Sequence, residues 1–291
     1  MEHERSSRAA TRSGTSSAAL SDLIGPVTEL LRSVADEVIS PRFGQLAPEE
    51  INEKAGAELT TAVDVEAETV LTSALRMLAP GVPVVGEEAA SADPTLLDLI
   101  GGTGKVWLVD PVDGTSNFAE GAPGYGSIIG LLDGGDVVAA WSWNALDDIV
   151  HVLGPDGVER HTAADTTSLA ELGDRTGQLR VIAKWWYLPE PLRRRVRGAL
   201  DSVEVVKGPG SAASEYPMLL DGSIDALLYG RTRAWDHAPG CAMVRRLGGV
   251  ARRLDGREYR PGVDGVGLLV ARSPATWARV RAGLDLAGLD L

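Results

Sequence analysis

The chain is poor in cysteine and in aromatic residues, and it contains no long apolar run. It has one cysteine, Cys241, among 291 residues, and aromatic residues make up 5% of the sequence. A single cysteine excludes an intramolecular disulfide and is typical of a reducing compartment, so we expect a cytoplasmic protein. No apolar stretch approaches the roughly 20 residues that cross a bilayer, and the N-terminus lacks an apolar signal core. The sequence therefore predicts no membrane partner.

Basic residues are scarce relative to acidic ones. The 28 Lys and Arg residues against 41 Asp and Glu residues give a formal net charge of −13. Nucleic acids and anionic membranes are bound through basic surfaces, so we expect neither as a partner. The acidity does not exclude a phosphorylated small molecule as a substrate, because a few bound cations reverse the local field.

The composition is that of a folded globular protein, with 44% hydrophobic and 24% charged residues. The length suits one large domain or two closely packed halves. We predict a disordered tail at residues 1–20, an N-terminal half at residues 21–178 and a C-terminal half at residues 179–291. The polar, turn-rich segment Gly154–Gly177 is the expected connection between the halves.

The spacing of apolar residues predicts different patterns in the two halves. In the first, Leu20–Val34 reads as an amphipathic helix, and a second helix begins with Asp64 as its N-cap. Ala67 occupies the position where a capping box needs Glu or Gln, so we expect no capping box there. A buried strand at Lys105–Asp110 and a β-hairpin over 125–143 complete this α+β half. The second half alternates as in α/β proteins, with expected strands at 180–183, 203–206 and 224–229 and helices at Pro191–Leu200, from Ser211 and from Asp236.

The most informative stretch is "VDPVDGT", which places acids on both sides of a proline. Proline cannot donate to a continuing strand ladder, so we expect a turn after Asp110 that brings its carboxylate close to that of Asp113. Gly114 allows the backbone to approach a ligand, and Thr115 stands where a helical turn with free N–H groups would suit phosphate. Close carboxylates beside an anion site are explained by hard cations such as Mg²⁺ between them. The alternative is a surface turn with Asp110 as a helix cap.

Four motifs occur in an order that resembles the inositol monophosphatase family of Mg²⁺-dependent, lithium-sensitive phosphatases. "DPVDGTSNF" is similar to the D-P-x-D-G-T-x-N-F signature of that family, and "VVGEEA" to its upstream G-E-E turn. "AWDHAPG", followed by "RRLGGV", resembles its W-D-x-A-x-G motif, and "LTTAVDVEAE" its T-x-x-D element. Lys54 is a further match to a basic position of the family.

The resemblance implies a centre with two or three Mg²⁺ ions. One ion would be bound by Glu87, Asp110 and the backbone carbonyl of Val112, and a second by Asp110, Asp113 and Asp236. The alternative for Asp236 is a helix cap. The implied activity is phosphoric monoester hydrolysis by water, with no covalent enzyme intermediate.

The resemblance also assigns catalytic roles. Thr115 and Glu87 would orient and help to deprotonate the attacking water, with Asp64 hydrogen-bonded to Thr115. The alternative for Asp64 is an N-cap alone. Glu88 is interpreted as an acid outside the ligand set, and the alternative for Lys54 is an ordinary solvent-facing lysine.

The substrate is less well defined than the metal centre. The resemblance implies that Asp113, with Gly114 and Thr115, the turn Gly210-Ser211-Ala212 and a residue before the W-D motif contact the substrate. Where inositol phosphatases often have an acid, this chain has Leu228 and Tyr229, followed by Arg231 and Arg233. The usual G-x-G-A-x-x-N-G hairpin is replaced by "LGPDGVERHTAADTT". Inositol, cyclitol, sugar and histidinol phosphates all remain open. The arginines would favour a second anionic group on the substrate, or they are simply solvated.

The fold that the resemblance implies is a layered αβαβα sandwich with the metals where the two halves meet, in a protein that forms homodimers. Besides a phosphomonoesterase, two alternatives stay open: a sugar bisphosphatase of the same fold, and a non-catalytic metal- or phosphate-binding regulator. Loss of a metal ligand would mark the regulator, and all of the implied ligands are present.

Overall fold

The computed structural model describes residues 17–54, 58–190, 192–284 and 286. Most of the tail predicted at residues 1–20 lies outside these residues, but residues 17–20 already belong to the first helix, α1 (Ser17–Val34). None of the helices in the described ranges is long and apolar enough to cross a membrane.

The first half is built on a seven-stranded sheet. Neighbouring strands are antiparallel except for the parallel pair β3 and β4 at one edge. The strands, in their order across the sheet, are β3 (Val84–Gly86), β4 (Lys105–Asp113), β5 (Gly126–Asp133), β6 (Asp136–Asn144), β7 (Ile149–Gly154), β8 (Gly157–His161) and β9 (Thr166–Ser168). The predicted hairpin is confirmed as β5 and β6, which pair antiparallel.

The segment 154–177, predicted as a connection, instead contributes two strands to this sheet. Strands β8 and β9 pair antiparallel to β7 and to each other. All three residues of β9 are exposed at the sheet edge, so the alternation of apolar and polar residues that reveals a half-buried strand is absent. The connection is the shorter stretch after Ser168.

The second half is built on a five-stranded sheet with mixed strand directions. Strands β10 and β12 are parallel neighbours, whereas β14 runs antiparallel to both β12 and β13. The strands, in order across the sheet, are β11 (Glu204–Val205), β10 (Arg180–Lys184), β12 (Ala226–Tyr229), β14 (Leu268–Ala271) and β13 (Val250–Arg252). The predicted alternation of strands and helices is present, with α5 (Leu192–Ala199), α6 (Ala212–Leu220), α7 (Ala234–Arg246) and α8 (Pro274–Gly283).

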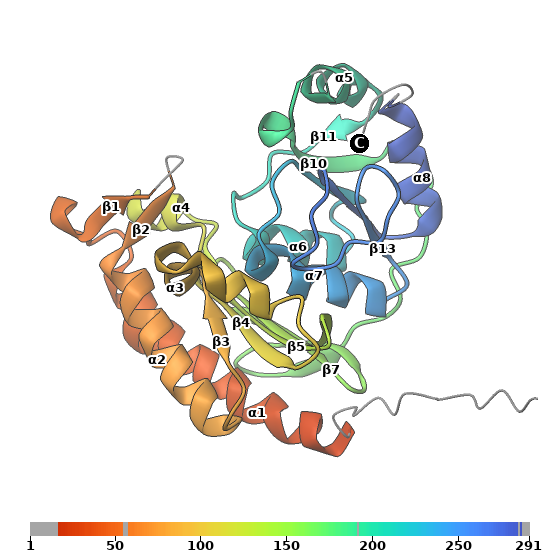
Figure 1. Cartoon of the computed structure of the whole chain (residues 1–291). Helices are drawn as coiled ribbons and strands as arrows, with labels where there is room; N and C mark the ends of the chain where they lie inside the picture. Colours follow the sequence, from red (N-terminus) through yellow and green to blue (C-terminus); the bar gives the residue numbers. More distant parts are fainter. Residues whose placement is uncertain (1–16, 55–57, 191, 285, 287–291) are drawn as a thin grey trace, which may run out of the picture.

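The elements form five layers, which confirms the predicted αβαβα sandwich (Figure 1). Helices α1 and α2 (Ala62–Leu78) cover the outer face of the seven-stranded sheet, and α6 and α7 lie between the two sheets. Successive side chains of a strand point to opposite faces, so the second sheet packs against a core on each of its two faces. Ile182 packs into the core shared with α6 and α7, whereas its neighbours Val181 and Ala183 pack into the core shared with α5 and α8.

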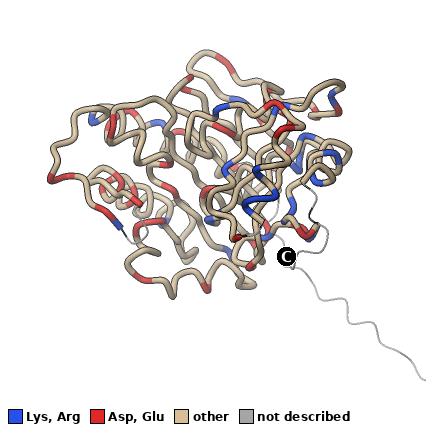
Figure 2. The backbone as a smooth tube through the Cα atoms, turned by 90° about the horizontal axis from the view of Figure 1, so that it is seen from above, with Lys and Arg blue, Asp and Glu red and all other residues tan. Residues whose placement is uncertain are grey.

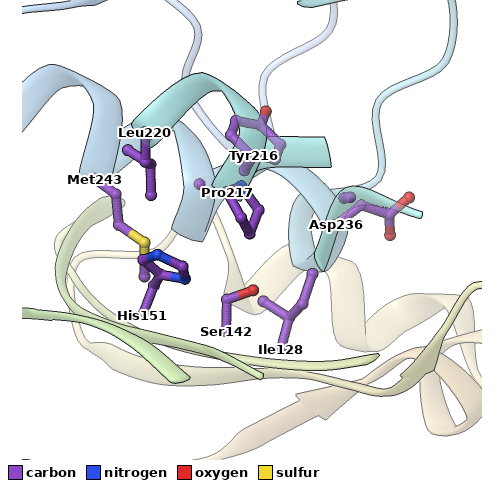
Figure 3. Close-up of a pocket in the computed structure, with 10 residues that line it drawn as sticks. Ile128, Ser142, His151, Tyr216, Pro217, Leu220, Asp236 and Met243 are labelled. Atoms are coloured by element: carbon purple, nitrogen blue, oxygen red, sulfur yellow. The ribbon is translucent and has the colours of Figure 1, made fainter. Parts of the chain in front are cut away.

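A small cavity lies between the seven-stranded sheet and helices α6 and α7 (Figure 3). Its volume of about 10 Å³ leaves room for at most one water molecule. His151 on its wall is buried, and burial lowers the pKa of this imidazole to about 4, so the ring is neutral at physiological pH. Asp236 lies at one end with its carboxylate directed away from His151, toward the site described below.

Two helical glycines make a matched test of the packing between the sheets. A Cβ at Gly240 in α7 would lie 2.4 Å from the buried ring of Tyr216 in α6, whereas a Cβ at Gly198 in α5 would meet nothing within 4 Å. We expect Gly240→Ala to lower the free energy of unfolding by about 1–3 kcal/mol through overpacking. Gly198→Ala should raise it by about 0.4–1 kcal/mol, because alanine favours the helix. Urea unfolding followed by circular dichroism measures both, and equal effects of the same sign would contradict this account of the α6–α7 contact.

Candidate functional site

Three carboxylates from separate elements converge at the junction of the two halves. Glu87 begins the short helix α3 (Glu87–Ala92), Asp110 lies in β4, and Asp236 lies in the first turn of α7. One oxygen atom of each lies within 4.8 Å of the others. Asp110 is almost fully buried, and its Oδ1 has no hydrogen-bond partner among the described residues. A buried carboxylate oxygen without a partner is costly, and a cation at this point would satisfy it.

The parallel pair β3 and β4 explains why Glu87 lies next to Asp110. Gly86 is paired with Val109, so the following residue of each strand emerges at the same carboxyl end. Glu68 of α2 fixes the start of α3, because its carboxylate accepts hydrogen bonds from the backbone N–H groups of Glu88 and Ala89, each at 2.8 Å. A Cβ at Gly86 would lie 2.2 Å from the Glu68 carboxyl carbon, so only glycine permits this approach.

The predicted turn after Asp110 is absent, and the chain instead continues as a bulged strand to Asp113. Asp110 is paired with Ile128 and Asp113 with Gly126, and the register shifts between these pairs. Pro111 has no N–H to donate, so the ladder is interrupted there without ending the strand. Both aspartates line the same pocket, but the oxygen atoms that converge with Asp110 belong to Glu87 and Asp236 rather than to Asp113.

Asp113 also ties the first half of the chain to the second. Its Oδ2 accepts a hydrogen bond from the backbone N–H of Ala213 in the first turn of α6. Gly114 has a φ of 87°, and a Cβ there would lie 2.7 Å from the carbonyl oxygen of Gly124 and 2.9 Å from Cβ of Ser211. The turn at residues 210–212, predicted to contact the substrate, therefore lies directly against the Asp113-Gly114 segment.

Asp64 lies beside Thr115 as predicted, but it is not the N-cap of α2. Thr61 is the N-cap, and its backbone N–H and hydroxyl both donate to Asp64 Oδ2, at 2.9 and 2.5 Å. The two residues form a capping box, which was not predicted because the N-cap lies three residues before the expected one and the shorter Asp replaces Glu. The other oxygen of Asp64 lies 3.2 Å from the Thr115 hydroxyl, which also lies 2.9 Å from the carbonyl oxygen of Val112.

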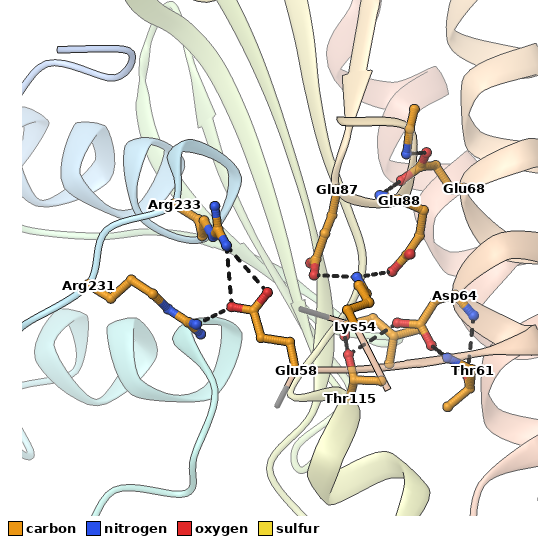
Figure 4. A network of polar contacts seen from close by, with 12 residues as sticks. Lys54, Glu58, Thr61, Asp64, Glu68, Glu87, Glu88, Thr115, Arg231 and Arg233 are labelled. Carbon is orange, nitrogen blue, oxygen red and sulfur yellow. Dashed lines mark hydrogen bonds and ion pairs between the residues drawn. The ribbon is translucent and has the colours of Figure 1, made fainter. Parts of the chain in front are cut away.

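Lys54 is part of the acid cluster and does not face solvent. Its ammonium group lies 2.9 Å from Glu87 Oε1 and 2.6 Å from Glu88 Oε1, with 10% of the side chain exposed (Figure 4). Burial acts to lower the pKa of Lys54, but the two carboxylates outweigh it and raise the pKa above its usual value. A permanent positive charge thus stands at one side of the cluster.

The remaining carboxylates are held in an environment that opposes their ionisation. Burial, and then repulsion from neighbouring carboxylates, raises the pKa of Asp110 and of Asp236 well above the usual range. Burial also raises the pKa of Asp113 and of Asp64 to about 7. The convergent donors are all oxygen atoms, which is the donor set of a hard divalent cation. The residues therefore fit a metal centre.

The carboxylates lie at one side of a pocket of about 630 Å³, which is large enough for a small phosphate ester. Its other side carries cationic and aromatic groups, among them Lys184, Arg231 and Arg233. Most Lys and Arg residues of the chain belong to residues 179–291 and most acids to residues 1–178. In Figure 2 the basic residues accordingly gather in the part of the molecule that leads to the C-terminus.

Arg231 and Arg233 remain partly exposed, with 39% and 43% of their side chains accessible, but neither is free, because both are paired with Glu58 across the pocket (Figure 4). Glu58 immediately precedes β2 (Leu59–Thr61), which forms a two-stranded ribbon with β1 (Ile51–Glu53). The distance from Arg233 Nη2 to Glu58 Oε2 is 3.3 Å. A carboxylate from the first half of the chain thus neutralises part of the charge expected to act on the substrate.

Sequence reasoning missed several residues that shape the site. Glu68 was detectable, because it follows Asp64 by four residues and shares its face of α2. Glu215 could not be detected from the sequence, because it lies inside an apolar helix. Fully buried in α6, it accepts a hydrogen bond from the Tyr229 hydroxyl at 2.8 Å and pairs with Lys184 at 2.9 Å.

Comparison with known proteins gives a consistent result. The family model described as the inositol monophosphatase family matches residues 20–282. A histidinol-phosphatase of Mycobacterium tuberculosis (strain ATCC 25618 / H37Rv) is 31% identical over 230 residues, covering 76% of this chain and 84% of the relative. An inositol-1-monophosphatase of Mycobacterium leprae (strain TN) is 33% identical over 241 residues, with 77% of each chain covered. In fold, the crystal structure of staphylococcal IMPase-I complexed with products matches with a TM-score of 0.77 at 16% identity, covering 92% of this chain and 97% of that one.

The raised pKa values predict that a divalent cation stabilises the protein more at about pH 8 than at about pH 5.5. An acid whose pKa is raised by folding stabilises the folded state below its unfolded pKa, and this contribution is lost as the pH rises through the folded pKa. Mg²⁺ must displace protons at low pH, whereas at high pH it relieves carboxylate repulsion. At a hundredfold excess over Kd the gain is about 2.7 kcal/mol.

Thermal unfolding of chelator-treated protein with and without Mg²⁺ measures this difference. Asp110→Asn is the matched variant: without metal it should unfold at a higher temperature than the unsubstituted protein at about pH 8, and it should gain little from Mg²⁺. An equal Mg²⁺ effect at both pH values would count against a shared cation among these acids.

Proposed function

Because the chain belongs to the inositol monophosphatase family, we propose that it is a Mg²⁺-dependent phosphoric monoester hydrolase acting on a small phosphorylated polyol. One observation carries the proposal: Glu87, Asp110 and Asp236 converge at the edge of a pocket around a buried carboxylate oxygen that has no hydrogen-bond partner in the described part of the chain. A non-catalytic regulator would not need the whole ligand set, yet every acid that the resemblance implies is present.

The proposed metal centre holds two or three Mg²⁺ ions. Glu87, Asp110 and the Val112 carbonyl would hold one ion, and Asp110, Asp113 and Asp236 a second. When bound, such ions supply positive charge that screens the substrate phosphate and makes a water molecule easier to deprotonate. The chain's own part is to keep these oxygens in place and to hold the substrate against them.

Thr115, Asp64 and Glu87 are the proposed catalytic residues. The Thr115 hydroxyl donates toward Asp64 or Val112, which leaves its oxygen free to accept a hydrogen bond from a water in the pocket. Glu87 is the proposed acceptor of the proton of that water. Burial raises the pKa of Glu87 above its usual value, which suits a proton acceptor, and the Lys54 ammonium opposes this shift by favouring the ionised form.

The proposed substrate contacts are Asp113, Gly114, Thr115 and the turn Gly210-Ser211-Ala212. Where many inositol phosphatases have a free acid, Tyr229 is a phenol that donates to Glu215. This supports a leaving group other than inositol, and histidinol phosphate is the second candidate because a 31% identical relative is named histidinol-phosphatase. From the family we also infer inhibition by lithium, a homodimer and a cytoplasmic location.

The proposed activity is tested by phosphate release from inositol, histidinol, sugar and nucleotide monophosphates. We expect turnover with Mg²⁺, none in excess chelator, and inhibition by Li⁺. Asp110→Asn should abolish turnover, since it removes a ligand shared by two ions. Glu88→Gln should reduce kcat/KM by no more than about 10–100-fold, as expected for a group that acts through Lys54. Full turnover in chelator, or equal losses in the two variants, would overturn the proposal.

The arginines give a separate prediction about selectivity. We expect Arg231→Ala or Arg233→Ala to raise KM for the best substrate with a smaller change in kcat, the pattern of lost uniform binding. The loss in kcat/KM should be about 1–3 kcal/mol, as for a charged hydrogen bond.

Glu58→Gln is the matched variant, because it removes the carboxylate that both arginines now contact. It should lower KM for a substrate with a second anionic group and leave KM for a neutral leaving group unchanged. Unchanged steady-state kinetics in all three variants would show that the arginines serve only to join the two halves.

A further inference from the structure

Two exposed aromatic side chains stand in the wall of the substrate pocket. The sequence "WWY" follows β10, and these residues, Trp185–Tyr187, form a short 3₁₀ turn. Trp185 packs against the core beneath α5, but Trp186 and Tyr187 remain 48% and 53% exposed. They are the only aromatic residues among the exposed large hydrophobic side chains of the described chain, and both line the pocket that holds the carboxylates.

The two rings have a defined geometry. The centroids of Trp186 and Tyr187 are 6.3 Å apart with an angle of 50° between the planes, so they form a corner. The guanidinium of Arg231 lies 4.6 Å from the centroid of the Tyr187 ring. A Cβ at Gly230 would lie 3.0 Å from the Tyr187 carbonyl carbon, so the chain before Arg231 passes close beneath this corner. The contact with Arg231 therefore positions the Tyr187 ring. The indole of Trp186 is exposed and lines the pocket.

Two adjacent exposed aromatic side chains in the wall of a pocket are suited to bind a ligand. Ligand pockets are lined predominantly by hydrophobic and aromatic side chains, and contiguous exposed apolar side chains mark binding sites, whereas isolated ones do not. A hydroxylated polyol is recognised mainly by hydrogen bonds, whereas a flat π-system gains most from stacking on an indole face. Glu58, which is paired with Arg231 beside the Tyr187 ring, would also accept a hydrogen bond from a ring N–H.

We propose that Trp186 and Tyr187 form a stacking site for a flat nitrogen heterocycle, such as an imidazole or a purine, in the leaving group of the substrate. This proposal rests on the proposed phosphatase function, because it places the phosphate at the carboxylates and the ring at the aromatic corner of one pocket. The heterocycle leaves with the alcohol that is released.

The test compares four esters in the Mg²⁺-loaded enzyme. Histidinol phosphate and adenosine 2′-monophosphate carry a flat heterocycle, whereas inositol 1-phosphate and glycerol 2-phosphate do not. Trp186→Ala should lower kcat/KM for the first two by about tenfold or more, within the range of stacking on aromatic side chains, and should change it less than about twofold for glycerol 2-phosphate. Trp186→Phe should restore most of the loss. Leu146→Ala, which truncates a 57% exposed side chain outside the pocket, is the control.

Equal losses on all four esters would assign Trp186 a structural role, and a loss on inositol 1-phosphate as large as on the heterocyclic esters would assign the site to a saturated ring; either result overturns the proposal. Tryptophan fluorescence separates this from failure of the proposed function. Histidinol and adenosine, which carry no phosphate, should quench the fluorescence of the intact protein but not that of Trp186→Ala. Quenching without phosphate release from any ester would contradict the phosphatase and retain the stacking site, and the absence of quenching would refute the site.

Discussion

Repulsion among buried carboxylates is the constraint on which the organisation of this protein depends. Asp110 and Asp236 are held where burial and their neighbours oppose ionisation, and one oxygen of Asp110 has no hydrogen-bond partner among the residues that the structure describes. The fold provides only partial compensation, through the Lys54 ammonium and the Ala213 N–H. The incomplete compensation is consistent with a site organised around cations that the chain does not itself supply.

The same constraint explains why the site lies between the two halves. Several acids on one face of a single helix or strand would destabilise that element, because like charges repel. The acids of this site are distributed among β4, α3 and α7. Contacts between the halves then fix their separation: Asp113 accepts from Ala213, and Glu58 is paired with Arg231 and Arg233. The geometry of the carboxylate cluster and the packing of the halves are therefore one property.

Asp110 and Asp113 were predicted from local signals, namely a buried strand followed by Asp-Pro and a glycine after Asp113. Glu87 and Asp236 were assigned through the motifs that resemble the family. The layered fold followed from the motifs and from the alternation of strands and helices. The β-bulge at Pro111 was not predicted, because it depends on pairing with β5, and the position of Lys54 was not, because it depends on acids more than thirty residues away. The edge strand β9 has no buried face to reveal it.

The capping of α2 shows a different kind of limit. Thr61 and Asp64 form a pattern visible in the sequence, but Asp64 alone also fits an N-cap, and only the helix start distinguishes the two. The pairing of Glu58 with two arginines lies beyond sequence reasoning altogether, because Arg233 is 175 residues away along the chain.

The hydrogen bond between Asp113 and Ala213 spans 100 residues of sequence, and Asp236 lies further along still. Contacts between such distant residues form late in folding, after the loops between them have closed. A chain emerging from the ribosome therefore displays the first acids long before their last partner exists. A cation centre at this junction would lack part of its ligand set until the second half is made, so tight binding would coincide with completion of the native structure.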